Sequence, residues 1–250
     1  MRDLVAKARV LAFIPLHGSR AQAPRARSRL PDFDAQHFAL GLTNYVVLLF
    51  SLSFHESAHA WMALRLGDDT AARLGRITLN PVPHIDPFGT VLMPLLQIFA
   101  SVPVLGWAKP TPYDPSRFRR EVSMRRGHIS VAVVGPLSNL FLAVVFAVLL
   151  AILVRVGAPD GMQEGLQNLL KVGVVMNVGL AIFNILPVPP LDGSHVLSWG
   201  LPRSIGEKFD HVAENYGNII LWVLFLSGAL GYIISPIRNL VLAALNALLF

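Results

Sequence analysis

The sequence contains no cysteine and few charged residues. Cysteine is absent from all 250 positions, which excludes disulfide bonds, cysteine metal ligands and a cysteine nucleophile. Charged residues make up 14% of the chain, compared with about 25% in soluble domains. Hydrophobic residues make up 54%, and the mean hydropathy is +0.55. The composition therefore predicts an all-α polytopic membrane protein, in which any metal is held by histidine and carboxylate side chains.

The charges that are present are mostly basic. The formal net charge is +6, which on a soluble protein would indicate nucleic acid as a partner. The arginines are not interleaved with a platform of aromatic residues, so nucleic-acid binding is not expected. On a membrane protein the same balance indicates basic loops on the inner side of the bilayer and contact with anionic lipid headgroups.

The first 37 residues differ from the rest of the chain. MRDLVAKARVLAFIPL has a basic start and an apolar run that resembles a signal peptide, but about ten apolar residues are too few to span a bilayer. HGSRAQAPRARSRLPD follows, and its Arg, Ala and Pro content predicts disorder. We therefore predict a basic arm at 1–37, a core at 38–200, and a C-terminal part at 201–250 with an amphipathic stretch and one or two transmembrane helices.

Apolar segments recur along the chain without an internal repeat. They cover about 38–66, 88–104, 128–156, 166–186 and 218–249. The second segment is the shortest and contains Pro94 and Pro103. The last segment is interrupted by Ser235 and Pro236, which predicts either one bent helix or two spans. Together they give about five to six hydrophobic segments.

The motif HESAHA follows the apolar stretch FALGLTNYVVLLFSLSF. In a helix His55 and His59 lie one turn apart on one face, so both imidazoles can bind one metal ion. Glu56 is rotated by about 100° from His55 and can reach a metal-bound water without becoming a ligand. A charge at membrane depth costs at least about 2.5–3.5 kcal/mol, and a metal offsets that cost. The alternative, two histidines bonded to backbone carbonyls at a helix end, leaves Glu56 unexplained.

A catalytic zinc site takes three protein ligands and leaves one position for water. The candidates for the third ligand are His84, Asp86, His128, Asp192 and His195. Asp192 is favoured because the prolines of NILPVPPL unwind the chain before it, and irregular backbone at membrane depth is tolerated where it lines a cavity. The alternative for Asp192 is an N-cap of the following helix. His195 either orients a ligand or lies at the surface.

Six short motifs occur in one order along the chain: HESAHA, GRITLNP, HIDPFGT, GWAKPTPYDP, GPLSN and FNILPVPPLDG. In these motifs and their order the chain resembles the site-2 proteases, which are intramembrane zinc metalloproteases. The resemblance covers about residues 40–200, and the arm 1–37 lies outside it. The chain is most similar to the compact bacterial and archaeal members without a PDZ domain, because no PDZ-like insertion is present.

The resemblance implies a role for particular residues. It assigns one Zn²⁺ per chain to His55, His59 and Asp192, a zinc-bound water as the nucleophile, and Glu56 as the general base. Two asparagines of the family are matched by Asn139 in GPLSN and Asn184 in FNILP. Each is a candidate for stabilising the oxyanion or binding the substrate backbone. The alternative for each is a hydrogen bond between helices.

The proposed ligands constrain the topology. HESAHA and the LDG motif must meet at one metal, yet their segments would end on opposite faces of the bilayer if every segment crossed. We therefore predict that 88–104 is re-entrant or folds at the interface. The loops 67–87 and 105–127 then share a side, and their arginines predict that it is the cytoplasmic side. The basic arm 1–37 would lie outside, which contradicts the same rule.

The expected substrate is a transmembrane protein or peptide, whose helix must unwind locally before cleavage. GRITLNP, at 75–81, alternates polar and apolar residues and predicts a small hairpin-like element, either an edge for the unwound substrate or an ordinary surface hairpin. The expected location is the inner (cytoplasmic) cell membrane, multi-pass, with the active site toward the cytosol. Two alternatives to a protease are a metal transporter, although transporters often show repeats, and a catalytically inactive membrane scaffold.

Overall fold

The computed structural model describes residues 35–100, 106–159 and 161–249, so the arm predicted at 1–37 lies almost wholly outside the described residues. In the described part the regular structure is helical and no strand occurs, which confirms the all-α prediction. The longer helices are α3 (Ala35–Leu66), α5 (Met93–Ala100), α6 (Met124–Val156), α7 (Gln163–Ile185), α8 (Asp192–Gly200), α9 (Arg203–Leu226) and α10 (Ala229–Leu249). The short ones are α4 (Thr70–Arg73), η1 (Val82–His84), η2 (Pro87–Leu92) and η3 (Pro115–Arg117).

Four helices of the described part are long and apolar enough to cross a membrane, which makes this a multi-pass membrane protein. They are Phe38–Leu66 within α3, and α6, α7 and α10. The apolar stretch Pro87–Phe99, which joins η2 to α5, is shorter than a span. Residues 101–105 lie outside the described part, so the re-entrant or interfacial course of the segment 88–104 stays a prediction.

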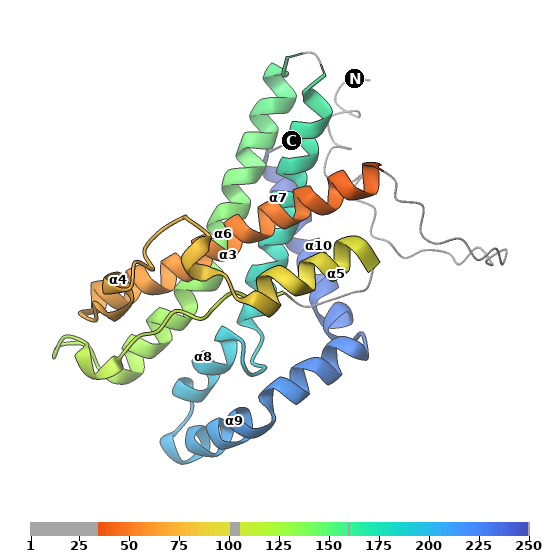
Figure 1. Cartoon of the computed structure of the whole chain (residues 1–250). Helices are drawn as coiled ribbons and strands as arrows, with labels where there is room; N and C mark the ends of the chain where they lie inside the picture. Colours follow the sequence, from red (N-terminus) through yellow and green to blue (C-terminus); the bar gives the residue numbers. More distant parts are fainter. Residues whose placement is uncertain (1–34, 101–105, 160, 250) are drawn as a thin grey trace.

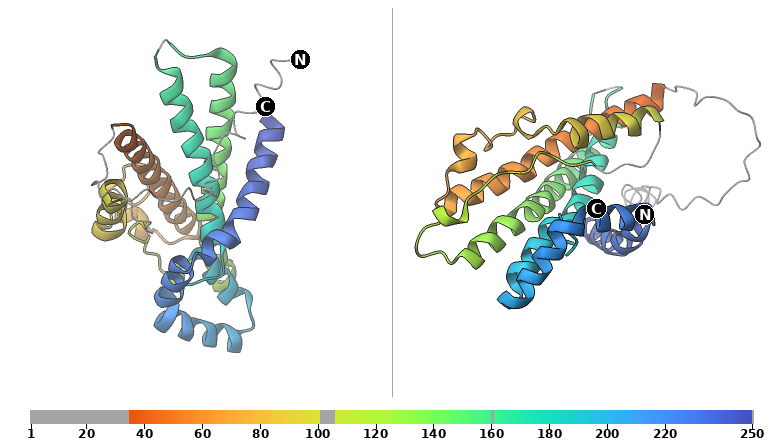
Figure 2. Two further views of the ribbon diagram at one scale, coloured as in Figure 1. Left: turned by 90° about the vertical axis from the view of Figure 1, so that its right-hand side faces the viewer. Right: turned by 60° about the horizontal axis from the view of Figure 1, so that its bottom comes forward.

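Helices α6 and α7 form an antiparallel pair, and α10 packs beside them (Figures 1 and 2). Small residues allow the close approach, since Ala143 and Ala147 of α6 are fully buried against Val174 and Val178 of α7. Helix α3 crosses this pair at an angle, with α5 alongside it (Figures 1 and 2). The chain therefore brings the middle of α3 against the first half of α6.

The C-terminal segment divides earlier than the sequence predicted. Helix α9 ends at Leu226 and α10 begins at Ala229, with Gly228 between them at a φ of 77°. A positive φ favours glycine, so the break forms there. Pro236 lies inside α10, and the neighbouring Ser235 hydroxyl donates 2.6 Å to Gly231 O. The sequence left open one bent helix or two spans at Ser235 and Pro236, and α10 continues through both residues as one helix.

The hairpin-like element predicted at 75–81 is wrong, because these residues form turns and bends. The backbone of Thr78 is bonded to side chains and not to a second strand. Thr78 N donates to Ser57 Oγ at 3.1 Å, and Thr78 O accepts from Ser57 Oγ and lies 3.1 Å from His84 Nε2. The backbone of Thr78 is therefore not available for pairing with another strand.

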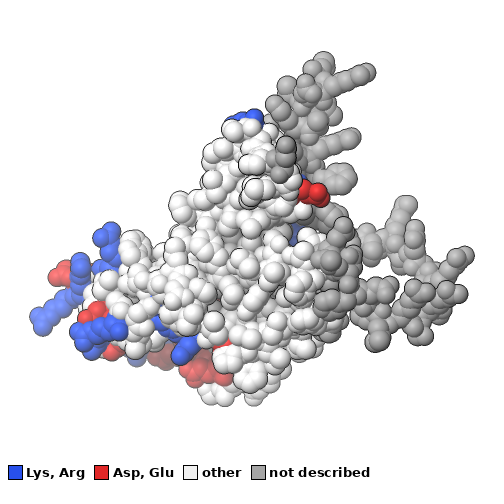
Figure 3. Space-filling model, turned by 45° about the horizontal axis from the view of Figure 1, so that its top comes forward, with Lys and Arg blue, Asp and Glu red and all other residues white. Residues whose placement is uncertain are grey.

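Basic side chains gather at one end of the molecule. Figure 3 shows them over α4, the loop before α6 and the start of α6, whereas most of the surface in that view is uncharged. The exposed arginines of these segments are Arg73, Arg117, Arg119, Arg120, Arg125 and Arg126. This is the end at which α3 finishes and α6 begins.

Candidate metal centre

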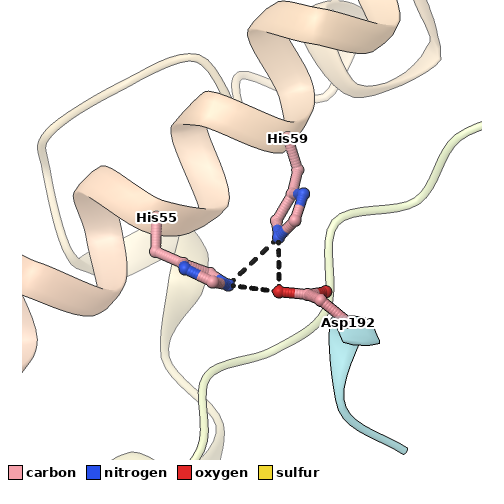
Figure 4. Close-up of side chains that lie close together, drawn as sticks. All are labelled: His55, His59 and Asp192. Atoms are coloured by element: carbon pink, nitrogen blue, oxygen red, sulfur yellow. Dashed lines mark hydrogen bonds and ion pairs between the residues drawn. The ribbon is translucent and has the colours of Figure 1, made fainter. Parts of the chain in front are cut away.

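Helix α3 presents the two histidines of HESAHA on one face (Figure 4), and both rings pack against Gly135 of α6. Both side chains are buried, His55 at 5% and His59 at 7% exposure. Their rings meet edge to face, and the two Nε2 atoms lie 3.0 Å apart. The spacing of one helical turn therefore places two ring nitrogens side by side, as the sequence predicted.

The other nitrogen of each ring is bonded to α6. His55 Nδ1 lies 2.7 Å from Asn139 Oδ1, and His59 Nδ1 lies 2.6 Å from Val131 O. Gly135 provides the space for both rings, because a Cβ there would lie 2.3 Å from His59 Nε2 and 2.6 Å from His55 Cε1. Helix α6 thus bonds the Nδ1 atom of both imidazoles and makes no hydrogen bond to either Nε2 atom.

The third member of the group is Asp192, the first residue of α8. After α7 the chain leaves the helical conformation at Leu186 and turns sharply. Gly193 is required there, because a Cβ would lie 2.1 Å from Ile185 O. The N-cap position of α8 is Leu191, so the capping role considered for Asp192 does not occur. The turn directs the Asp192 carboxylate toward the two histidines (Figure 4).

The geometry fits one metal ion. Asp192 Oδ2 lies 3.2 Å from His55 Nε2 and 3.4 Å from His59 Nε2, separations that suit donor atoms with bonds of about 2.0–2.2 Å to a shared zinc. Oδ2 is buried and has no hydrogen-bond partner. In the described part of the chain these three residues form the group of histidine and acidic side chains that could hold a metal ion. Two imidazole nitrogens and a carboxylate oxygen that converge in this way suit a bound cation, which would offset the cost of burying the carboxylate.

Glu56 lies beside this group and is fixed by the loop before α6. Its Oε2 accepts from Thr111 N at 2.9 Å and lies 2.8 Å from Thr111 Oγ1. Both Glu56 and the three metal-binding candidates line a cavity of about 660 Å³. One carboxylate oxygen of Glu56 is thus held in place, and the other has no partner among the described residues.

Arg76 supports the loop that carries Thr111. Its guanidinium is buried at 4% exposure and donates to Pro83 O and, at 2.8 Å, to Pro110 O. His84 packs beside it, 3.5 Å from Arg76 Nη1. Burial lowers the pKa of His84 below its ordinary value, which keeps a neutral ring next to the guanidinium. This cluster joins the segment after α4 to the loop before α6.

The remaining candidates for the third ligand lie elsewhere. Asp86 caps η2 by accepting from Phe88 N and Gly89 N. His84 is bonded to the Thr78 carbonyl. His128 stacks on Trp199 at 4.0 Å and pairs with Tyr113 Oη at 2.9 Å, and burial raises the pKa of Tyr113 to about 12. His195 is exposed at the cavity wall. Of the five candidates, Asp192 is the one that meets both histidines.

The two asparagines singled out in the sequence occupy different places. Asn139 is fully buried behind His55 and is not part of the cavity wall. Asn184 lines the cavity, and its Nδ2 donates 3.0 Å to Leu180 O of its own helix. The oxyanion role considered for Asn139 is therefore not supported, since its amide faces the ring of His55. One N–H of the Asn184 amide is therefore used within its own helix, which leaves Oδ1 and the second N–H of the amide without a partner in the described part of the chain.

Sequence reasoning missed three residues of the site: Thr111, Gly135 and Asn177. Thr111 lies in GWAKPTPYDP and Gly135 lies in GPLSN. Both therefore belong to motifs noted in the sequence, but no role was predicted for either residue. Asn177 lies in α7, is fully buried and bonds to Asn139. A polar residue deep in an apolar segment was the signal that could have found it.

Comparison with known proteins gives the family. The family profile described as "Peptidase family M50" matches residues 151–228, a range that includes Asp192. The protein named "Putative zinc metalloprotease YwhC" of Bacillus subtilis is 36% identical over 207 residues, which cover 81% of this chain and 90% of that protein. The chain belongs to peptidase family M50. "Putative zinc metalloprotease Rip2" of Mycolicibacterium smegmatis is 30% identical over 182 residues, 73% of this chain and 66% of that protein. No solved structure matches the chain.

Membership of the M50 family, the site-2 protease family, confirms the resemblance found in the motifs. The protein is a membrane metalloprotease of this family, and zinc is its metal. The transporter and scaffold alternatives receive no support from these relatives. No PDZ domain is evident, as the sequence predicted.

Proposed function

We propose that this M50 protein cleaves peptide bonds of transmembrane or membrane-associated substrates within the membrane. The observation that carries the proposal is the placement of Glu56 and the group His55, His59 and Asp192 on one cavity between helices that are long enough to span a bilayer. A peptide bond that enters this cavity meets a metal site and a carboxylate together. That pair of groups is the requirement for metal-assisted hydrolysis.

In this proposal His55, His59 and Asp192 hold the zinc. A bound zinc ion supplies a Lewis acid for the scissile carbonyl and makes water more acidic. The protein side of the arrangement is already oriented, since α6 bonds the outer nitrogen of each ring. Such bonds fix the imidazole orientation and increase its basicity as a ligand.

Glu56 serves as the general base. Its carboxylate takes a proton from the attacking water and passes it to the nitrogen of the leaving amine. The hydrogen bonds from Thr111 hold Oε2, so Oε1 is the atom that faces the water. Thr111 is thereby a positioning residue for the base, because it restricts the carboxylate to one orientation.

The substrate enters as an unwound segment. A transmembrane helix hides its amides in its own hydrogen bonds, so its backbone must open before a carbonyl can reach the site. Asn184 at the cavity wall can accept a hydrogen bond from an exposed substrate N–H through Oδ1. The backbone of Thr78 does not take this role, because it is already bonded to Ser57.

The active site faces the cytosol in this proposal. The basic end of the molecule in Figure 3 is the cytosolic end, because positively charged loops are retained on that side. His59 precedes the end of α3 at Leu66 by seven residues, a rise of about 10 Å along the helix. Water therefore needs a short path from the cytosolic surface to the site.

The test uses the full-length protein in lipid vesicles with a labelled transmembrane peptide that carries helix-weakening residues near its centre. We expect Glu56→Gln to retain zinc and to lower the cleavage rate by about 100-fold or more. We expect Asp192→Ala to lose both zinc and cleavage. Glu207→Gln is the matched control, since Glu207 is an exposed residue of α9 that pairs with Arg203.

Three results would overturn the proposal. Cleavage at the wild-type rate by Glu56→Gln would remove Glu56 from the reaction. Full zinc content in Asp192→Ala would remove Asp192 from the metal site. Cleavage of an extended soluble peptide with no cleavage of the transmembrane peptide would place the reaction outside the membrane.

A further inference from the structure

A pair of buried asparagines connects α7 to the metal centre on α3. Asn139 of α6 and Asn177 of α7 both have 0% exposure. Asn139 Oδ1 lies 2.7 Å from His55 Nδ1, and Asn139 Nδ2 donates 3.0 Å to Asn177 Oδ1. Asn177 Nδ2 donates 2.9 Å to both Gly173 O and Ser51 Oγ. Neither amide touches the cavity, so the proposed reaction does not use them directly.

The hydrogen bonds that link Asn177, Asn139 and His55 can run in only one direction. Gly173 O is a backbone carbonyl and accepts only, so the NH₂ group of Asn177 must face it. The Oδ1 of Asn177 then faces Asn139 and requires the NH₂ group of Asn139. A second carbonyl, Ser51 O at 3.5 Å from Asn139 Nδ2, favours the same orientation. Both amide orientations therefore follow from fixed backbone groups.

This direction determines which nitrogen of His55 carries the proton. The Oδ1 of Asn139 faces His55 Nδ1 and accepts, so Nδ1 is the protonated nitrogen. A neutral imidazole has one N–H, which leaves the lone pair on Nε2. That atom is the one that faces Asp192 Oδ2 and His59 Nε2. The metal-binding tautomer of His55 thus depends on a carbonyl of α7, two side chains away.

We propose that Asn177 is a positioning residue for the metal, which acts by holding Asn139 in the orientation that keeps His55 Nε2 free to bind zinc. The proposal rests on the proposed role of His55 as a ligand. Without Asn177, the Asn139 amide can rotate and present NH₂ to His55. The tautomer with Nε2–H, which cannot bind a metal, is then stabilised.

A variant pair separates this role from simple packing. Asn177→Leu keeps the approximate volume and removes the acceptor that orients Asn139. Asn139→Asp makes orientation irrelevant, because both carboxylate oxygens accept and either can bond to His55 Nδ1–H. The effect of Asn177→Leu on zinc should therefore be large in the wild-type background and absent in the Asn139→Asp background.

The experiment measures zinc affinity by chelator competition on the full chain in detergent micelles. We expect Asn177→Leu and the smaller Asn177→Ala to weaken zinc binding about 10-fold or more, as loss of groups that orient ligands does. The matched control is Asn215→Leu. Asn215 is an exposed residue of α9 that lies outside the cavity wall and makes the same bond to the carbonyl four residues earlier, so zinc affinity should be unchanged.

The outcomes distinguish the two proposals. Wild-type zinc affinity in Asn177→Leu and Asn177→Ala overturns the positioning role. An equal loss in the Asn139→Asp background also overturns it, because the effect is then one of packing. If His55→Ala keeps its zinc, the ligand assignment itself fails. Loss of zinc in His55→Ala and in both Asn177 variants, with recovery in the Asn139→Asp background, supports both proposals.

Discussion

The two sides of the metal centre are built in different ways. On the α3 side, both histidine rings are buried and their outer nitrogens are already bonded to α6. On the α8 side, the Asp192 side chain is 19% exposed, follows an irregular turn, and has an Oδ2 without a hydrogen-bond partner. The comparison indicates that the α3 side is oriented before metal binds. The α8 side relies on the turn and on the metal for its position.

The largest expected effect comes from filling the space behind the histidines. Gly135→Ala places a methyl group within 2.3–2.6 Å of ring atoms of His55 and His59, so both rings must move away from α6. We expect zinc content to fall to about a tenth of the wild-type value or less, because both ligands lose their orientation. Metal analysis of the purified protein measures this loss.

The matched control for this change is Gly179→Ala in α7. A Cβ at Gly179 meets no atom within 4 Å, and alanine favours a helix over glycine by about 0.5–1 kcal/mol. Zinc content should therefore be unchanged and thermal stability equal or higher. Full zinc content in Gly135→Ala would show that the α3 side is not rigidly oriented, and the comparison would fail.

A smaller effect on zinc is expected from the α8 side. Gly193→Ala brings a methyl group to 2.1 Å from Ile185 O, so the backbone of the turn must shift. We expect a loss of about 1–3 kcal/mol in stability and weaker zinc binding, because excess zinc can draw Asp192 back into place. A zinc titration with a thermal melt measures both effects. Zinc content that excess metal does not restore would contradict the flexible role given to this side.

The smallest effect on zinc is expected from the loop that holds the base. Thr111→Val removes the hydroxyl contact to Glu56 Oε2 and keeps the backbone contact. We expect unchanged zinc content and a value of kcat/KM that is about 10- to 100-fold lower, since a misplaced base reacts slowly. Thr43→Val is the control, because the Thr43 hydroxyl bonds only to Ala39 O of its own helix. Loss of zinc in Thr111→Val would show that this loop also holds the metal ligands. The distinction between the loop that positions Glu56 and the metal-binding residues would then fail.

The apolar segments could be predicted from the sequence because a bilayer demands long runs of hydrophobic residues. The spans within α3, α6, α7 and α10 follow that rule. The break between α9 and α10 was not predicted, because only Ser235 and Pro236 were considered as an interruption of this segment. Gly228 prevailed because its positive φ ends a helix, whereas Ser235 bonds the carbonyl of Gly231 beside the proline.

The metal-binding candidates could be predicted in part. His55 and His59 follow from helical periodicity alone, since residues four apart share a face. Asp192 was one of five candidates on residue chemistry, and it became the choice because a proline-rich break at membrane depth suits a cavity. Thr111 and Asn177 could not be assigned, because their tasks depend on contacts with Glu56 and Asn139 that are distant in the chain.

Local sequence was thus sufficient for the helices, the HESAHA face and the membrane setting, because each depends on residues within a turn or on simple hydrophobicity. The assembly of the complete site depended on the packing of α3, α6 and α8, which sets the 3.2–3.4 Å separations between the ring nitrogens and the carboxylate oxygen. The packing of the helices also decided the roles of Asn139 and Asn184. Asn139 and Asn184 have the same side chain, but one is enclosed behind His55 and the other lines the cavity. A hydrogen bond needs its partner within about 3 Å, and only the tertiary fold determines which partner is there.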